Sequence, residues 1–67
     1  MEKTIFLEDQ PYDNTPMTGK RLGGVSDRTV GFWGRAGKLP PPVKIGKQNF
    51  YQRAEVDAHV LLRQRNG

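Results

Sequence analysis

Three consecutive prolines, Pro40, Pro41 and Pro42, limit what this chain can fold into more than any other feature. Proline lacks a backbone N–H and its fixed φ clashes inside a helix, so neither a helix nor a central strand can continue through this segment. A second break stands earlier, at Gly23-Gly24. Any helix between the two breaks is therefore confined to the short segment 25–39.

Two short helices are predicted around the Gly23-Gly24 break. Thr15 before Pro16 marks the start of a helix over 16–22, because proline is tolerated at the first helical position. The second helix follows Ser26, whose hydroxyl can accept a hydrogen bond from a backbone N–H near Thr29. Gly37 fits the left-handed residue that closes a helix.

A small hairpin and a last helix are predicted after the prolines. Val43–Ile45 and Asn49–Tyr51 read as two strands joined by 46–48, with glycine at a turn position. The last helix covers about 53–64, and Trp33, Phe50 and Tyr51 are expected in the core. The predicted fold class is mainly α with a small β-hairpin: a winged helix-turn-helix made of a helix-turn-helix, a two-stranded wing and a C-terminal helix.

The two ends of the chain are expected to lie outside this domain, which spans 15–64. Residues 1–14 are predicted to form an N-terminal arm, in which Ile5-Phe6-Leu7 is either a short strand or an apolar plug. Pro11, Asp13 and Asn14 are interpreted as turn residues. Residues 65–67 are a short C-terminal tail.

Composition excludes several classes of function. With no cysteine and a single histidine among 67 residues, the chain offers no disulfide and no ligand set for zinc. No apolar run approaches the length of about 18 residues that crosses a membrane. The acidic residues are dispersed, without a base or nucleophile beside them, so no catalytic residue, metal or cofactor is assigned. A cytoplasmic protein that is not an enzyme is expected.

Charge is unevenly distributed along the sequence. Residues 1–19 carry a net charge of −3, whereas residues 20–53 carry +7, within a chain of net charge +4. A basic section of this kind is typical of a surface that binds a polyanion such as nucleic acid. A solvated basic surface without a ligand is the alternative.

Three segments, in order, resemble one known family: LGGVSDRTVGFW at 22–33, LPPPVKIG at 39–46 and FYQRAEVDAH at 50–59. They are similar to the small AlpA-like regulators and the excisionases of prophages and integrative elements, whose winged-helix domain is related to that of MerR. The sequence departs from that pattern at Gly31 and Gly34, where longer residues are usual, and at His59, where a tryptophan is usual.

The resemblance and the basic residues together assign a DNA-binding surface. The second helix is expected to face the major groove, which admits a helix and offers guanine to arginine and thymine methyls to apolar groups. Its residues are Ser26, Arg28, Thr29, Phe32 and Arg35. The wing is expected to contact the phosphate backbone or the adjacent minor groove through Lys44, Lys47, Gln48 and Asn49. Peripheral phosphate contacts are assigned to Lys20, Arg21 and Lys38.

The resemblance implies an excisionase, that is, a recombination directionality factor that binds and bends duplex DNA cooperatively so that an element is excised. Its expected partners are double-stranded DNA, further copies bound in tandem, and a tyrosine or serine integrase, in the nucleoid of a bacterial or phage-infected cell. Two alternatives stay open: a transcriptional regulator on a promoter operator, and a protein-interaction module that uses Ile5-Phe6-Leu7 and the proline segment without binding DNA.

Overall fold

The computed structural model describes residues 1–66, with side chains described as far as Val60. Its elements, in chain order, are β1 (Thr4–Leu7), β2 (Gln10–Asn14), α1 (Thr15–Arg21), α2 (Asp27–Arg35), β3 (Val43–Ile45), β4 (Gln48–Gln52) and α3 (Arg53–Asn66). The predicted helices and the hairpin after the prolines are confirmed within a residue or two.

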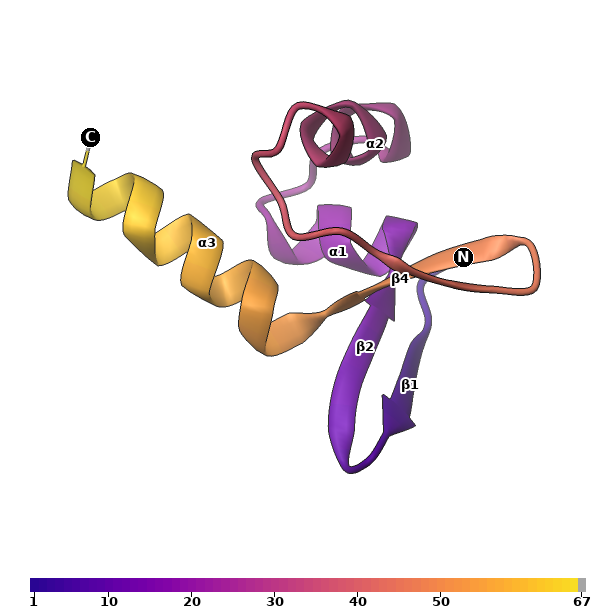
Figure 1. Cartoon of the computed structure of the whole chain (residues 1–67). Coiled ribbons are helices and arrows are strands. Elements are labelled where there is room, and N and C mark those ends of the chain that lie inside the picture. The colour runs from indigo at the N-terminus through magenta and orange to yellow at the C-terminus, as the bar shows by residue number, and fades with distance from the viewer. Residues whose placement is uncertain (67) are drawn as a thin grey trace.

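The predicted fold class is wrong. The four strands form one antiparallel sheet in the order β1-β2-β4-β3, so the protein is a mixed α/β fold and not a mainly α domain with a two-stranded wing. The β3–β4 hairpin is extended by β2, which pairs with the other edge of β4 (Figure 1). Residues expected as an arm thus supply half of the sheet.

The error has a local cause in the turn between β1 and β2. Glu8 and Asp9 alone connect Leu7 to Gln10, with φ of 51° and 65°. Such a two-residue turn usually contains Asn-Gly or Asp-Gly, because other side chains are strained in the left-handed region. Glu-Asp carries no such signal. The interpretation of Pro11, Asp13 and Asn14 as turn residues is also wrong, since all three lie in β2.

The core lies between the sheet and the helices. Phe50 and Tyr51 in β4 are both buried although neighbouring side chains point to opposite faces, so the middle of β4 is covered on both sides. The cluster on the Tyr51 side joins all three helices to the sheet. Its buried members are Val30, Leu39, Tyr51 and Val56, and Leu22, Val25, Trp33 and Val60 pack against them partly buried.

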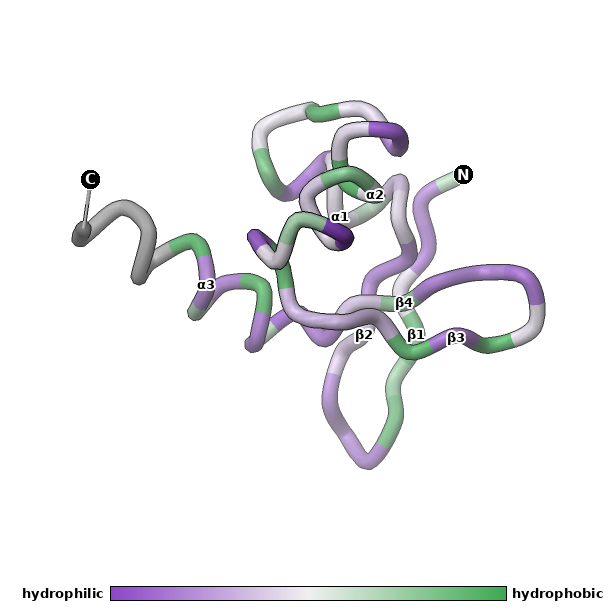
Figure 2. Tube along the Cα trace, turned by 45° about the horizontal axis from the view of Figure 1, so that its top comes forward, coloured by the Kyte–Doolittle hydropathy of each residue, from purple (hydrophilic) through white to green (hydrophobic). Residues whose placement is uncertain are grey.

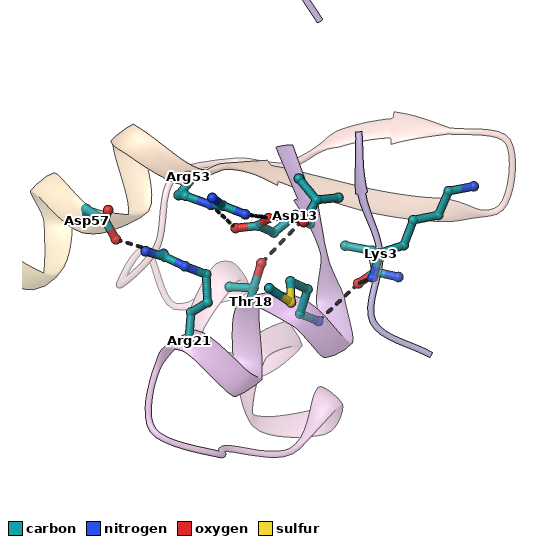
Figure 3. A network of polar contacts seen from close by, with 9 residues as sticks. Lys3, Asp13, Thr18, Arg21, Arg53 and Asp57 are labelled. Atoms are coloured by element: carbon teal, nitrogen blue, oxygen red, sulfur yellow. Dashed lines mark hydrogen bonds and ion pairs between the residues drawn. The ribbon is translucent and has the colours of Figure 1, made fainter. Parts of the chain in front are cut away.

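Asp13 links the first two strands to the last helix through hydrogen bonds. Its carboxylate, almost fully buried, accepts hydrogen bonds from the Nε and Nη2 atoms of Arg53 at 3.0 and 2.7 Å and from the Thr4 hydroxyl at 2.7 Å. The Thr18 hydroxyl donates to the Asp13 carbonyl at 3.3 Å (Figure 3). Residues of β1, β2, α1 and α3 therefore meet at one acid.

Burial alone would raise the pKa of Asp13. The hydrogen bonds from Arg53 and Thr4, together with the charge of Arg53, outweigh burial and hold the pKa below its ordinary value of 3.8. The ionised form is thus favoured by folding. Its contribution to stability is complete above the ordinary pKa and is lost as the pH falls through the lower, folded-state value.

Asp13→Asn is expected to lower the free energy of unfolding by about 2 kcal/mol, because a neutral amide replaces the buried carboxylate that accepts two hydrogen bonds from the half-buried Arg53 guanidinium. Chemical denaturation at pH 7 measures the loss. The variant should also lose much of the wild-type decline in stability as the pH falls below the ordinary carboxyl pKa of 3.8.

The matched control for Asp13→Asn is Arg21→Gln, which breaks the exposed pair that Arg21 forms with Asp57 at 3.2 Å. An exposed pair of this kind contributes at most about 1 kcal/mol. Equal losses in the two variants would contradict the central place given to Asp13.

The β1–β2 turn supplies a second prediction. Replacing Glu8-Asp9 by Asn-Gly should raise the free energy of unfolding by about 1 kcal/mol or more, since both positions have positive φ and the new pair accepts it readily. Chemical denaturation again measures the change. A loss of stability would mean that the turn does not have this geometry.

Candidate nucleic-acid interface

The start of α2 is fixed by Ser26. Its Oγ accepts a hydrogen bond from the backbone N–H of Thr29 at 3.2 Å and lies 3.1 Å from the Thr29 hydroxyl. Asp27 in the first turn complements the helix dipole. The predicted capping function of Ser26 is confirmed, and the two hydroxyls assigned to DNA are already bonded to each other.

One face of α2 presents two arginines and an aromatic ring. Arg28, Phe32 and Arg35 follow one another at spacings of four and three, and all three are exposed. Phe32 is 57% exposed, whereas Val30 on the opposite face is fully buried. Among the residues whose side chains are described, neither arginine forms an ion pair or a side-chain hydrogen bond. Their charges are free for a ligand.

The four residues predicted to contact DNA from the wing lie on different parts of the β3–β4 hairpin. Lys44 and Asn49 are opposite each other across the two strands and share a face with Tyr51, toward the side that α2 covers. Gln48 lies on the other face, where its Oε1 accepts a hydrogen bond from Asn14 at 3.3 Å. Lys47 is at the exposed turn, in the hydrophilic tip of the hairpin (Figure 2).

A hollow of about 220 Å³ lies between α2 and this hairpin. Its walls come from both elements and from the proline segment. The lining residues are Gly31, Gly34, Arg35, Pro41, Pro42, Asn49 and Tyr51. Arg35 folds back along α2, so that a Cβ on Gly31 would lie 3.9 Å from its Nη1.

Tyr51 forms the floor of the hollow. A Cβ on Gly34 would lie 3.4 Å from the Tyr51 hydroxyl, so α2 approaches the sheet closely at this point. Burial raises the pKa of Tyr51 above its ordinary value, and a hydrogen bond with the Thr15 side chain and the positive charge of Arg35 partly oppose the rise. The hydroxyl is therefore neutral near pH 7 and lies in the field of the Arg35 guanidinium.

The three residues assigned to peripheral contacts lie in different settings. Lys20 pairs with Glu2 at 3.2 Å, and Arg21 pairs with Asp57 at the same distance. Lys38 is exposed just after α2, where its backbone N–H closes the helix by donating to the Trp33 carbonyl at 2.8 Å. Of these three cations, only Lys38 adjoins the exposed face of α2.

Sequence reasoning placed the cations of this surface but missed the hollow. The only signal of it was the pair of glycines three residues apart in a helix that needed no such residues. The role of Pro41 and Pro42 as its wall has no sequence signal, because prolines indicate only where a helix or a central strand must stop. Arg53 was also missed, since a contact with Asp13 needs the N-terminal strands.

Over the described part of the chain, no helix has the length and apolar character needed to span a membrane. Comparisons of this chain with protein-family models, curated proteins and solved structures found no match. The case for a function therefore depends on the sequence segments and the geometry given above.

Gly19 positions α2 and supplies a test of that geometry. A Cβ at Gly19 would clash with the carbonyl oxygen of Val25 and press on the Val30 side chain at 3.3 Å. Gly19→Ala should therefore destabilise the fold by about 2 kcal/mol, although alanine favours helices. Thermal unfolding measures the loss. An increase in stability would show that α1 and α2 are not packed this closely.

Proposed function

We propose that this protein binds duplex DNA, with α2 directed at the major groove and the β3–β4 hairpin beside it. The observation that carries the proposal is Phe32, a large apolar side chain left 57% exposed between Arg28 and Arg35. An exposed aromatic ring leaves apolar surface in contact with water, which is unfavourable. It suits a surface that touches thymine methyl groups while the arginines bind guanines or phosphates.

The placement of charge supports the same orientation. The turn of the β1–β2 hairpin carries Glu8 and Asp9 and lies at the opposite end of the molecule from α2 (Figure 1). An acidic turn at that end avoids repulsion by phosphates.

Within this function, we favour an excisionase acting with a tyrosine or serine integrase, in which several copies bind in tandem and bend the DNA. The support is the resemblance of the segments 22–33, 39–46 and 50–59 to that family. A single domain of this size offers few base contacts, so tandem binding would supply the specificity that one copy lacks. A regulator on a promoter operator is the alternative.

Footprinting over the DNA that flanks the gene separates the two roles. An extended protected tract, with bending that depends on protein concentration, is the outcome expected for the excisionase. One isolated protected site without bending would favour the regulator. Binding that becomes tighter when an integrase is present would also support the excisionase.

DNA binding itself is tested by Phe32→Ala and Arg28→Ala, each expected to weaken binding about tenfold. Both side chains are exposed, so the midpoint of thermal unfolding should change by only a few degrees. Fluorescence anisotropy with labelled duplexes measures affinity. For wild type contacting six phosphates, log K should fall with log salt at a slope of about −5.

The matched control is Gln10→Glu, which lowers the net charge by one beside the β1–β2 turn, at the opposite end of the molecule from α2 (Figure 1), and should leave affinity within about twofold. The absence of binding to any duplex at low salt would overturn the proposal and favour the protein-interaction alternative. Equal effects of Gln10→Glu and Arg28→Ala would mean that net charge alone drives binding.

A further inference from the structure

We propose that the hollow between α2 and the β3–β4 hairpin is a seat for one backbone phosphate of the bound DNA, with Arg35 and Asn49 as its ligands. This inference rests on the proposed function and adds a site to it. The hollow lies between the two elements directed at the duplex, so a DNA strand that follows the surface from α2 to the hairpin must pass over it.

The hollow is large enough for a phosphate. Its volume of about 220 Å³ compares with about 30 Å³ for one water molecule. Gly31 and Gly34 keep it open on the α2 side, since neither has a Cβ that would project into it. Pro41 and Pro42 form a rigid wall opposite, because their φ angles are fixed.

The polar groups around the hollow suit an anion. Arg35 brings a guanidinium without an ion pair among the described side chains, and its fork can bind two phosphate oxygens at once. Asn49 contributes an amide that can donate. The Tyr51 hydroxyl lies at the floor, where it is neutral near pH 7. None of the described residues that line the hollow carries a carboxylate.

The charge continues outward from the hollow along the hairpin. Lys44 is the cross-strand neighbour of Asn49 and lies on the same face. Arg35, Asn49 and Lys44 thus form a polar row from α2 to the hairpin. A row of this kind matches successive phosphates of one strand, with the seat as its most enclosed point.

Filling the hollow with methyl groups tests the seat. Gly31→Ala and Gly34→Ala meet only ordinary contacts, 3.9 Å from Arg35 Nη1 and 3.4 Å from the Tyr51 hydroxyl. Alanine also favours the helix, so each variant should unfold at a temperature several degrees higher. The double variant should nevertheless bind duplex DNA about tenfold more weakly, with a salt slope smaller in magnitude by about 0.9.

Two further variants separate charge from shape. Arg35→Gln should give the same loss of slope, and added to the glycine double variant it should cause little further loss, because both changes remove one contact. Asn49→Ala should weaken binding severalfold, whereas its control Gln52→Ala, which removes an amide from the other face of β4, should not.

The outcomes distinguish this inference from the proposed function. If wild type binds DNA and the glycine variants bind equally well with higher stability, the seat is overturned and DNA binding stands. If the glycine and Arg35 effects are additive, they act at separate places and the seat is also overturned. If wild type binds no duplex, both proposals fail together.

Discussion

The hydrogen-bonded pair of Asp13 and Arg53 is the interaction on which the rest of the structure depends. It joins the second strand to the first residue of α3, and Thr4 and Thr18 attach β1 and α1 to the same acid. A small domain has little apolar surface to bury, so a buried carboxylate that is hydrogen-bonded to a half-buried guanidinium specifies which segments meet. Because β4 runs directly into Arg53, this contact also fixes the central strand.

From β4 the constraint reaches the candidate interface. One edge of β4 pairs with β2 and its other edge pairs with β3, so the β3–β4 hairpin has a defined direction relative to the helices. Tyr51 lies in the same strand and packs in one cluster with Val30 of α2 and Val56 of α3. The exposed face of α2 and the hairpin are thus held at a set distance by one buried layer, as the proposed DNA-binding surface requires.

The parts of the structure that could be predicted are those that neighbouring residues in the sequence determine. The Ser26 cap, the Gly23-Gly24 break and the closing Gly37, with φ of 78°, follow from residue chemistry within one helical turn, and they were predicted correctly. The β1–β2 hairpin was not, because Glu8-Asp9 adopts a turn that its own preferences oppose. Nothing near Asp13 in sequence indicates that Arg53 will reach it across the sheet. The basic residues assigned to DNA binding were named from the sequence alone, whereas the hollow between α2 and the hairpin is seen only in the structure.

Gly31 and Gly34 of α2 are the sequence signal of the hollow, although the hollow itself is formed by segments that are distant in sequence. Each is unfavourable in a helix by about 1 kcal/mol, and for neither would a Cβ meet anything closer than an ordinary contact. Packing therefore explains Gly19, whose Cβ would clash, but it does not explain Gly31 and Gly34. A residue that lowers stability and is not needed for packing indicates a constraint other than folding, such as the binding of a ligand. Both glycines line the same hollow as Arg35 and Asn49, so the requirement is best understood as access by a ligand to that place.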